Sequence, residues 1–60
     1  MERYIVEKKV KGRFCYHASF PEKKDALLVA RLITDAETRV FDRQLRMIIE
    51  TKEETNHDNK

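Results

Sequence analysis

The sequence predicts an α+β fold in which a two-stranded antiparallel β-hairpin packs on one long C-terminal α-helix, and we expect this unit to dimerise. Three observations lead to this prediction. Residues 4–20 alternate between apolar and polar side chains on either side of Gly12, the only glycine of the chain. Pro21 interrupts this alternation. From Glu22 to Lys52 apolar side chains recur instead at helical spacing.

Residues 4–10 and 14–20 are the two predicted strands. A two-residue turn between them would mix polar and apolar side chains on both faces, whereas a three-residue loop at residues 11–13 separates them, because directly opposed residues share a face. In this register one face is apolar except for Lys8, whose long stem can pass the core. We expect this face to pack on the helix. It consists of Tyr4, Val6, Lys8, Val10, Phe14, Tyr16, Ala18 and Phe20.

The predicted helix begins after Pro21, since proline and an acidic residue suit a first helical turn. At 100° per residue, apolar side chains from Ala26 to Ile48 fall on one broad face. Residues 34–37 match a capping box, so a division into two helices near Thr34 stays open. Residues 1–52 would form a single domain, and residues 53–60, which have no apolar side chain, a disordered tail.

The helix would outreach the hairpin, because about 30 helical residues span roughly 45 Å and seven-residue strands only about 23 Å. A core of this size is also marginal. We therefore expect a homodimer, the commonest oligomer, or a groove on another protein, to cover the remaining apolar surface. Whether helices or strand edges would join the two copies stays open. The expected interface consists of Leu28, Leu32, Val40, Phe41, Leu45, Ile48 and Ile49.

Thirteen Lys and Arg against eleven Asp and Glu give a net charge of +2. The charge is uneven, since residues 1–31 hold eight basic and four acidic side chains, a balance of +4. One cysteine, Cys15, excludes an intramolecular disulfide framework. No apolar run has the length of a signal peptide or a membrane span, so we expect a soluble cytoplasmic protein with no membrane contact.

No enzyme template fits this sequence, and we expect neither a cofactor nor a metal. Cys15 and His17 lie two residues apart on the outer face of the predicted hairpin, without an orienting third group. With Glu7 they would give three ligands on one flat face, which is not the closed tetrahedral set of a structural metal site.

The hairpin is basic along its outer face and tip. A two-stranded ribbon of this kind can enter the major groove of DNA, with cations reaching phosphates or guanine edges. The expected nucleic-acid contacts are Arg3, Lys9, Lys11, Arg13, His17, Lys23 and Lys24. The same cations would also protect strand edges from aggregation. We thus expect a small regulatory protein that binds nucleic acid. The alternative is a protein-binding module that uses its apolar helix surface, an inhibitor or adaptor of a larger cellular protein, of the phage or mobile-element accessory type.

Residues 8–20, Lys8-Lys9-Val10-Lys11-Gly12-Arg13-Phe14-Cys15-Tyr16-His17-Ala18-Ser19-Phe20, and the helix start at Lys23-Lys24-Asp25-Ala26 weakly resemble the arm-type, AP2-like DNA-binding modules of phage integrases. The resemblance covers residues 4–33 and implies a DNA-binding role. Those modules place three strands before the helix, and this sequence predicts two.

Overall fold

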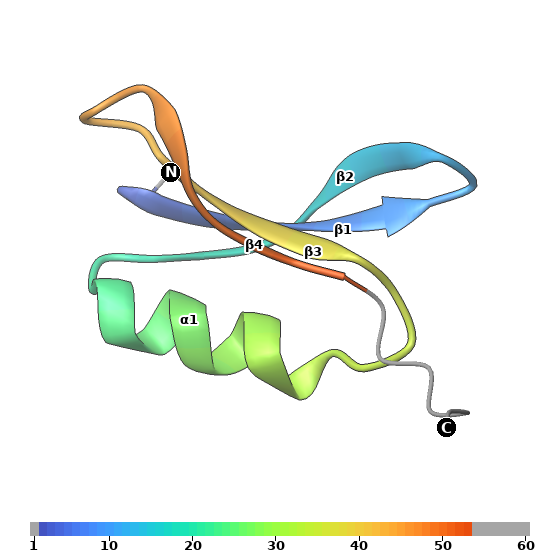
Figure 1. Ribbon diagram of the computed structural model, residues 1–60. Coiled ribbons are helices and arrows are strands. Elements are labelled where there is room, and N and C mark those ends of the chain that lie inside the picture. Colours follow the sequence, from blue (N-terminus) through green and yellow to red (C-terminus); the bar gives the residue numbers. More distant parts are fainter. Residues whose placement is uncertain (1, 54–60) are drawn as a thin grey trace.

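The computed structural model describes residues 2–53, which form a four-stranded antiparallel sheet with one helix against one of its faces (Figure 1). The elements are β1 (Tyr4–Val10), β2 (Arg13–Phe20), α1 (Lys23–Leu32), β3 (Thr38–Asp42) and β4 (Met47–Lys52). The strand order is β2-β1-β3-β4, so β1 and β3 are central and β2 and β4 are edges. The fold is α+β, but the predicted hairpin on a long C-terminal helix is wrong: the helix is short and lies between two hairpins.

β1 and β2 form a hairpin through a two-residue turn, not the predicted loop at residues 11–13. Val10 pairs with Arg13 across the turn. Lys11 and Gly12 have positive φ angles of 53° and 81°. Two positive φ angles are what a type I′ turn requires, and this turn matches the right-handed twist of the flanking strands. The tight turn therefore prevails over the clean sorting of faces that favoured a longer loop.

A β-bulge in β2 lets the strands keep this two-residue turn and still place apolar side chains in the core. The register shifts between Val6, which pairs with Ala18, and Glu7, which pairs with Tyr16, so His17 is the extra residue. The pairing of Val6 with Ala18 was predicted, whereas the pairing nearer the turn differs by one residue. As a result Phe14 lies opposite Lys9 and on the face away from the helix, not on the core face.

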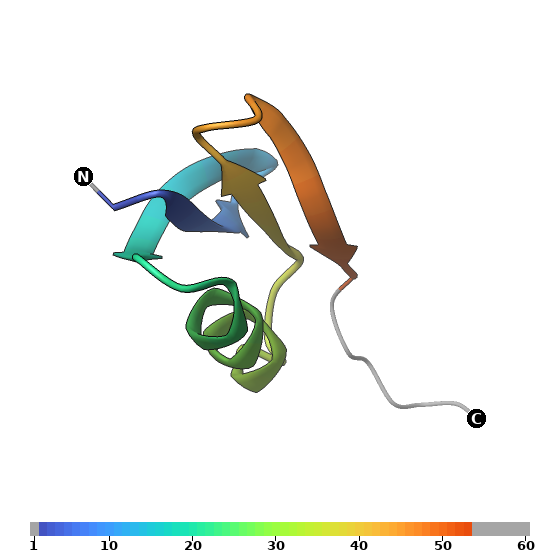
Figure 2. The same cartoon turned by 90° about the vertical axis from the view of Figure 1, so that its left-hand side faces the viewer.

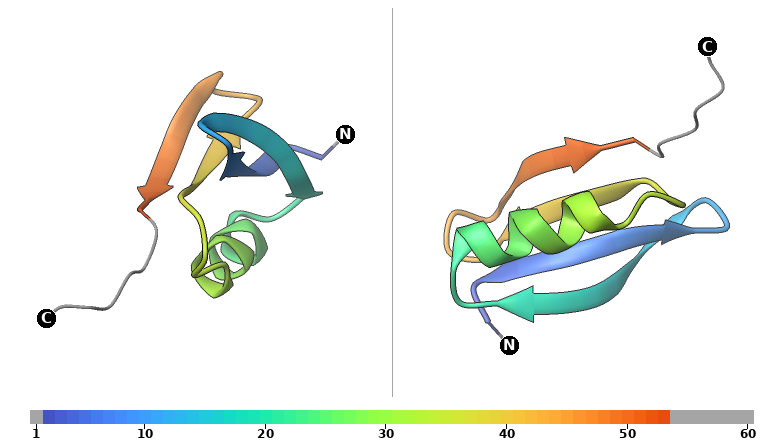
Figure 3. Two further views of the ribbon diagram at one scale, coloured as in Figure 1. Left: turned by 90° about the vertical axis from the view of Figure 1, so that its right-hand side faces the viewer. Right: turned by 90° about the horizontal axis from the view of Figure 1, so that it is seen from below.

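α1 begins directly after Pro21 and Glu22 and packs on the sheet through small residues. Ala26 and Ala30 are fully or almost fully buried, which lets the helix backbone approach the strands closely. Figure 2 views the helix nearly end-on beneath the sheet, and Figure 3 shows it from below, running along β1 and β3. The helix ends at Leu32. The predicted capping box at residues 34–37 lies in the connection to β3 and begins no helix.

The second half of the predicted helix is the β3–β4 hairpin. In β3 the side chains of Thr38, Val40 and Asp42 are buried and the two residues between them are half-buried, the period of two that a strand requires. The same residues also fit a helix. The apolar pairs at residues 40–41 and 48–49 are eight residues apart, which is close to two helical turns. Short apolar runs therefore did not distinguish two short strands from one long helix.

The core lies between α1 and the two central strands. Tyr4, Val6 and Val40 from the sheet meet Ala26 and Ala30 from the helix. The hydroxyl of Thr38, fully buried, donates a hydrogen bond of 3.4 Å to the carbonyl oxygen of Ala30. Around this centre pack half-buried apolar side chains from β2, α1, the loop after it and β4, namely Phe20, Leu27, Val29, Ile33 and Ile49.

The fold removes one of the two reasons for which a dimer was predicted. The long helix with an uncovered apolar half is instead a pair of strands in the chain's own sheet, whereas the small size of the core is unchanged. A four-stranded sheet thus forms within one chain, without a second copy. Of the predicted tail, residues 53–60, only Glu53 lies within the described residues. No helix in residues 2–53 is long and apolar enough to cross a membrane.

Candidate nucleic-acid interface

The face of the sheet opposite α1 is covered by no other element of residues 2–53 (Figure 2). Because opposed residues share a face, the pairing of the strands identifies its members. We call this surface the open face. It consists of Ile5, Glu7 and Lys9 on β1, Phe14, Tyr16 and Ser19 on β2, Arg39 and Phe41 on β3, and Ile48 and Thr51 on β4.

A cation–aromatic cluster lies at the end of the open face nearest the β1–β2 turn. The guanidinium carbon of Arg39 lies 4.0 Å from the ring centroid of Phe14, and the Nζ atom of Lys9 lies 5.5 Å from the same centroid. Arg39 Nε donates a 2.6 Å hydrogen bond to Glu7 Oε1. Lys9 Nζ lies 3.3 Å from Glu37 Oε1. Glu7 and Glu37 thus hold Arg39 and Lys9 against the ring of Phe14. All of these side chains are half-buried and remain in contact with solvent.

Tyr16 is the most accessible aromatic side chain of the open face. Its exposed fraction is 56%, whereas Phe14 and Phe41 are half-buried. The Tyr16 hydroxyl and the Ser19 hydroxyl lie 3.2 Å apart and form a hydrogen bond. This bond holds the ring along the edge strand and leaves its surface open to solvent.

The turn of the β1–β2 hairpin carries two cations that lie close to this aromatic surface. Lys11 and Arg13 are exposed, and neither side chain forms an ion pair or a hydrogen bond with another described residue. Lys9 pairs with Phe14 across the strands on the open face, whereas Arg13 pairs with Val10 and points to the other face of the hairpin. We call Lys9, Lys11 and Arg13 the basic tip. It lies at the opposite end of the molecule from the β3–β4 turn (Figure 1).

The predicted nucleic-acid residues do not form one surface. The basic tip brings three of them together. Arg3 precedes β1 at the other end of the sheet, and Lys23 and Lys24 begin α1 at that same end (Figure 1). His17 is the exposed bulge residue of the β2 edge.

The sequence reasoning missed Phe14, Tyr16 and Arg39 as members of the same surface. It placed the two aromatics on the core face through the wrong register, and Arg39 in a helix. The dipeptide Lys11-Gly12 between two alternating runs was the available signal, since glycine in a two-residue loop is typical of a tight hairpin.

The predicted interface residues are also dispersed. Val40 is fully buried and Ile49 packs against the core, so neither is available to a partner. Phe41 is half-buried on the open face, and Leu45 is exposed in the β3–β4 turn. The other three are exposed, Ile48 on β4 and Leu28 and Leu32 on α1.

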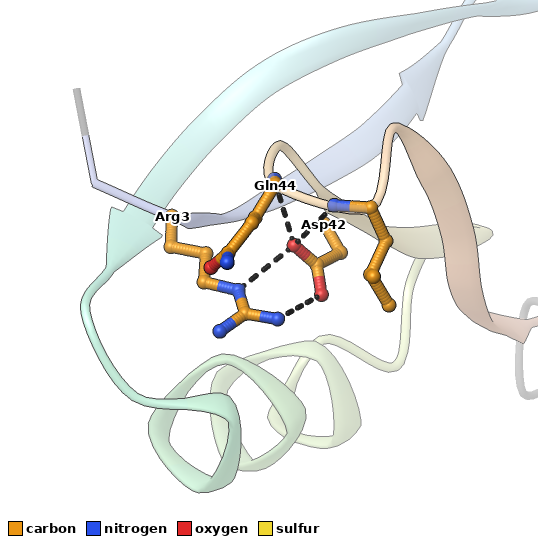
Figure 4. A network of polar contacts seen from close by, with 4 residues as sticks. Arg3, Asp42 and Gln44 are labelled. Atoms are coloured by element: carbon orange, nitrogen blue, oxygen red, sulfur yellow. Dashed lines mark hydrogen bonds and ion pairs between the residues drawn. The ribbon is translucent and has the colours of Figure 1, made fainter.

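Asp42 is the centre of a second polar cluster (Figure 4). It ends β3 at the β3–β4 turn, at the end of the molecule away from the basic tip (Figure 1). Arg3 donates two hydrogen bonds of 2.9 Å to its carboxylate, and the backbone N–H groups of Gln44 and Leu45 donate bonds of 2.9 and 3.2 Å to Oδ1. The hydrogen bond from Arg3 is the main cause that lowers the pKa of Asp42 to about 2, with the backbone bonds adding to it and burial opposing it. The cluster ties the start of β1 to the β3–β4 turn and gives Arg3 a structural partner.

The described residues offer no metal-binding arrangement, and Cys15 lies apart from the other polar clusters. Residues 2–53 contain no group of three or more His, Cys, Asp or Glu side chains that could hold a metal ion. Cys15 is exposed on β2 and lies opposite Lys8, on the same side of the sheet as the helix. Cys15 thus lies on the face opposite to the cation–aromatic cluster.

Comparison of the chain with protein-family models, with curated proteins and with solved structures gives no significant match. The resemblance to integrase arm-type modules therefore stays a prediction. The structure has two strands before the helix and two after it, not three strands followed by a helix.

Proposed function

We propose that the protein is a small nucleic-acid-binding protein whose contact surface is the basic tip of the β1–β2 hairpin. The observation that carries this proposal is the state of its cations: Lys11 and Arg13 are exposed and unpaired in residues 2–53, beside Lys9. Phosphate groups are the natural counter-charge for such a cluster, and they provide most of the affinity in protein–nucleic acid complexes.

Most other cations of the fold, Lys9 with Glu37 among them, have internal partners, which makes Lys11 and Arg13 stand out. Arg3 pairs with Asp42, Lys8 with Asp35, Lys24 with Glu22 and Arg39 with Glu7. Lys52 Nζ donates a hydrogen bond to the Ile33 carbonyl oxygen. Lys23, Arg31 and Arg46 have no such partner among the described residues, and they lie at three separate places, the start and the end of α1 and the β3–β4 turn.

The backbone of the turn supports a functional role for Lys11. A left-handed conformation costs a residue with a side chain about 1–2 kcal/mol, and asparagine or glycine is the usual occupant of this turn position. Lysine at a φ of 53° is therefore unfavourable locally, as is Arg46 at a φ of 60° in the β3–β4 turn. Residues held in sparsely populated conformations cluster at functional sites. A lysine that projects from the hairpin tip toward a phosphate gives a reason for this choice.

The test compares two double variants that remove the same charge from different places. Lys11→Gln with Arg13→Gln removes two cations of the basic tip, and Lys23→Gln with Arg31→Gln removes two unpaired cations of α1. Binding to a short DNA is measured by fluorescence anisotropy over a range of salt concentrations. The tip variant should lose affinity and lower the slope of log K against log[salt] by about 1.4–1.8, because each phosphate contact contributes about 0.7–0.9.

The helix variant should keep most of both the affinity and the slope. Equal losses in the two variants would mean that binding follows net charge and not the basic tip. A native protein that binds no DNA or RNA at low salt would contradict the proposal as a whole.

A second candidate function is association with protein through the outer face of α1, a second copy of the chain included. Leu28 and Leu32 carry it, with exposed fractions of 55% and 71% at a spacing of four residues on one helix face. Sedimentation of the native protein and of Leu32→Glu tests it. The native chain should be heavier than a monomer, and the variant should be monomeric with an unchanged circular dichroism spectrum. A native monomer that captures no protein partner would exclude this candidate.

A further inference from the structure

We propose that the ligand of the basic tip is a single-stranded polynucleotide, and that the open face stacks its bases on Tyr16 and on the Arg39–Phe14 pair. This inference rests on the proposed function and specifies the ligand. It also extends the site from the hairpin tip onto the sheet.

The first step is the position of the aromatic side chains. Phe14 and Tyr16 are alternate residues of β2, so they lie on the same face of the sheet, about 7 Å apart along the strand. β2 is an edge strand, and no other described element covers this face (Figure 2). Successive bases of a single strand stack on aromatic side chains in this kind of setting.

The second step is the orientation of Arg39. Its guanidinium lies over the Phe14 ring at 4.0 Å and is fixed by the 2.6 Å hydrogen bond to Glu7. Its side chain is 35% exposed, so it remains in contact with solvent. A planar guanidinium held in place in this way is itself a platform for a base.

The third step is charge complementarity. The basic tip adjoins the aromatic surface, since Lys9 lies opposite Phe14 on the open face and the exposed turn residue Lys11 follows two positions later. Arg13 pairs with Val10 and belongs to the other face of the same hairpin end. A strand whose bases lie on the open face would therefore bring its phosphates to Lys9 and to the hairpin turn at Lys11, with Arg13 within reach only around the edge of β2. The two acidic groups nearest this surface, Glu7 and Glu37, are each paired with a cation of the same cluster.

The aromatic surface of the open face favours a single strand over a duplex. In a duplex the faces of the bases are stacked on one another and cannot reach a side chain. The open face presents aromatic surface, together with the half-buried Ile5 and Phe41, and this surface would lie against phosphates if a duplex docked there. Only unstacked bases can therefore gain binding energy by stacking on Tyr16 and on the Arg39–Phe14 pair.

The experiment measures affinity for one mixed sequence of about 15 nucleotides, within the range that small β-domains bind, as single-stranded DNA, single-stranded RNA and duplex DNA. The native protein should bind a single-stranded form more tightly than the duplex. Tyr16→Ala should weaken single-strand binding roughly fivefold or more, because it removes a stacking surface. The slope against salt should not change, because no charge is lost.

Tyr16→Phe is the matched control, since it keeps the ring and loses the hydrogen bond to Ser19. It should bind like the native protein. Arg39→Lys is a second probe, which keeps the charge but loses the planar group, and it should weaken single-strand binding without changing the salt slope. Unfolding curves of each variant identify any loss that comes from instability.

Tyrosine fluorescence gives a second readout. The chain has two tyrosines and no tryptophan, and Tyr4 is buried in the core. Stacking of a base on Tyr16 should quench the emission, and Tyr16→Phe should abolish the quenching while it leaves binding intact.

The outcomes separate this inference from the proposed function. Equal or tighter binding to duplex, or equal losses in Tyr16→Ala and Tyr16→Phe, would overturn the single-strand assignment. If Lys11→Gln with Arg13→Gln still abolished binding in that case, the nucleic-acid function would stand. Absence of binding to all three probes would overturn both.

Discussion

At the scale of single residues, Asp42 shows how one carboxylate can hold two distant parts of the chain together. It accepts hydrogen bonds from Arg3, 39 positions earlier, and from the backbone of the turn that follows it. Because these donors favour the charged form, the pKa of Asp42 is lowered to about 2. Ionised Asp42 therefore favours the folded state.

This contribution should disappear in acid. In the unfolded chain Asp42 titrates near its ordinary pKa of about 4, so its stabilising effect is complete above that pH and is lost as the pH falls to about 2. Urea unfolding of the native protein and of Asp42→Asn should give a large difference near neutral pH and a much smaller one at pH 2. Asp35→Asn is the control, because its pair with Lys8, 3.7 Å apart, is exposed and contributes little. A deficit of Asp42→Asn that persists undiminished at pH 2 would contradict this account.

Two apolar residues expected at an interface have opposite positions in the fold, and their truncation should show it. Val40 is fully buried, and Leu28 is 55% exposed. Val40→Ala should lower the free energy of unfolding by about 2 kcal/mol, through lost burial and a cavity. Leu28→Ala should change it by less than about 0.5 kcal/mol. The midpoint of urea unfolding measures both, and similar values for the two variants would be inconsistent with this core.

At the scale of elements, the β1–β2 turn is the most informative, because its backbone conformation conflicts with one of its residues. Lys11→Asn should raise the free energy of unfolding by about 0.5–1 kcal/mol, since asparagine tolerates the left-handed region better. Gly12→Ala should lower it by about 1 kcal/mol. A Cβ atom at Gly12 would meet no atom within 4 Å, so that loss reports backbone strain alone.

The variant Lys11→Asn also connects stability with function. Lys11→Asn should be more stable than the native protein and should bind nucleic acid more weakly, because it removes a cation of the basic tip. Thermal unfolding and the anisotropy measurement together test this trade-off. A variant that gained stability and kept its full affinity would show that Lys11 makes no phosphate contact.

At the scale of the whole molecule, the order β2-β1-β3-β4 predicts how protection against hydrogen exchange is distributed. β1 and β3 are bonded on both sides and carry the core residues Val6 and Val40. Their amides should exchange most slowly, at rates near those of global unfolding. The outward amides of β2 and β4 should exchange faster. Protection of β4 equal to that of β3 would indicate that a second chain pairs with this edge.

The sequence by itself determined the local features whose causes lie within a few residues. The β1–β2 hairpin, the place of its turn around Gly12 though not the turn's length, the start of the helix after Pro21 and the cations at the hairpin end follow from alternation, glycine, proline and charge. The pairing of Val6 with Ala18 was also recovered, because the apolar residues farthest from the turn must share the core.

Only the tertiary structure decided the second half of the fold. Residues 38–52 fit a helix and a hairpin about equally as a pattern, and the free edge of β1 selects the hairpin by providing a partner for β3. The bulge at His17 likewise depends on the core, which fixes one end of β2 while the turn fixes the other. These two choices place Phe14, Tyr16 and Arg39 on one face. The candidate site therefore depends on contacts between residues far apart in the sequence, which local pattern does not encode.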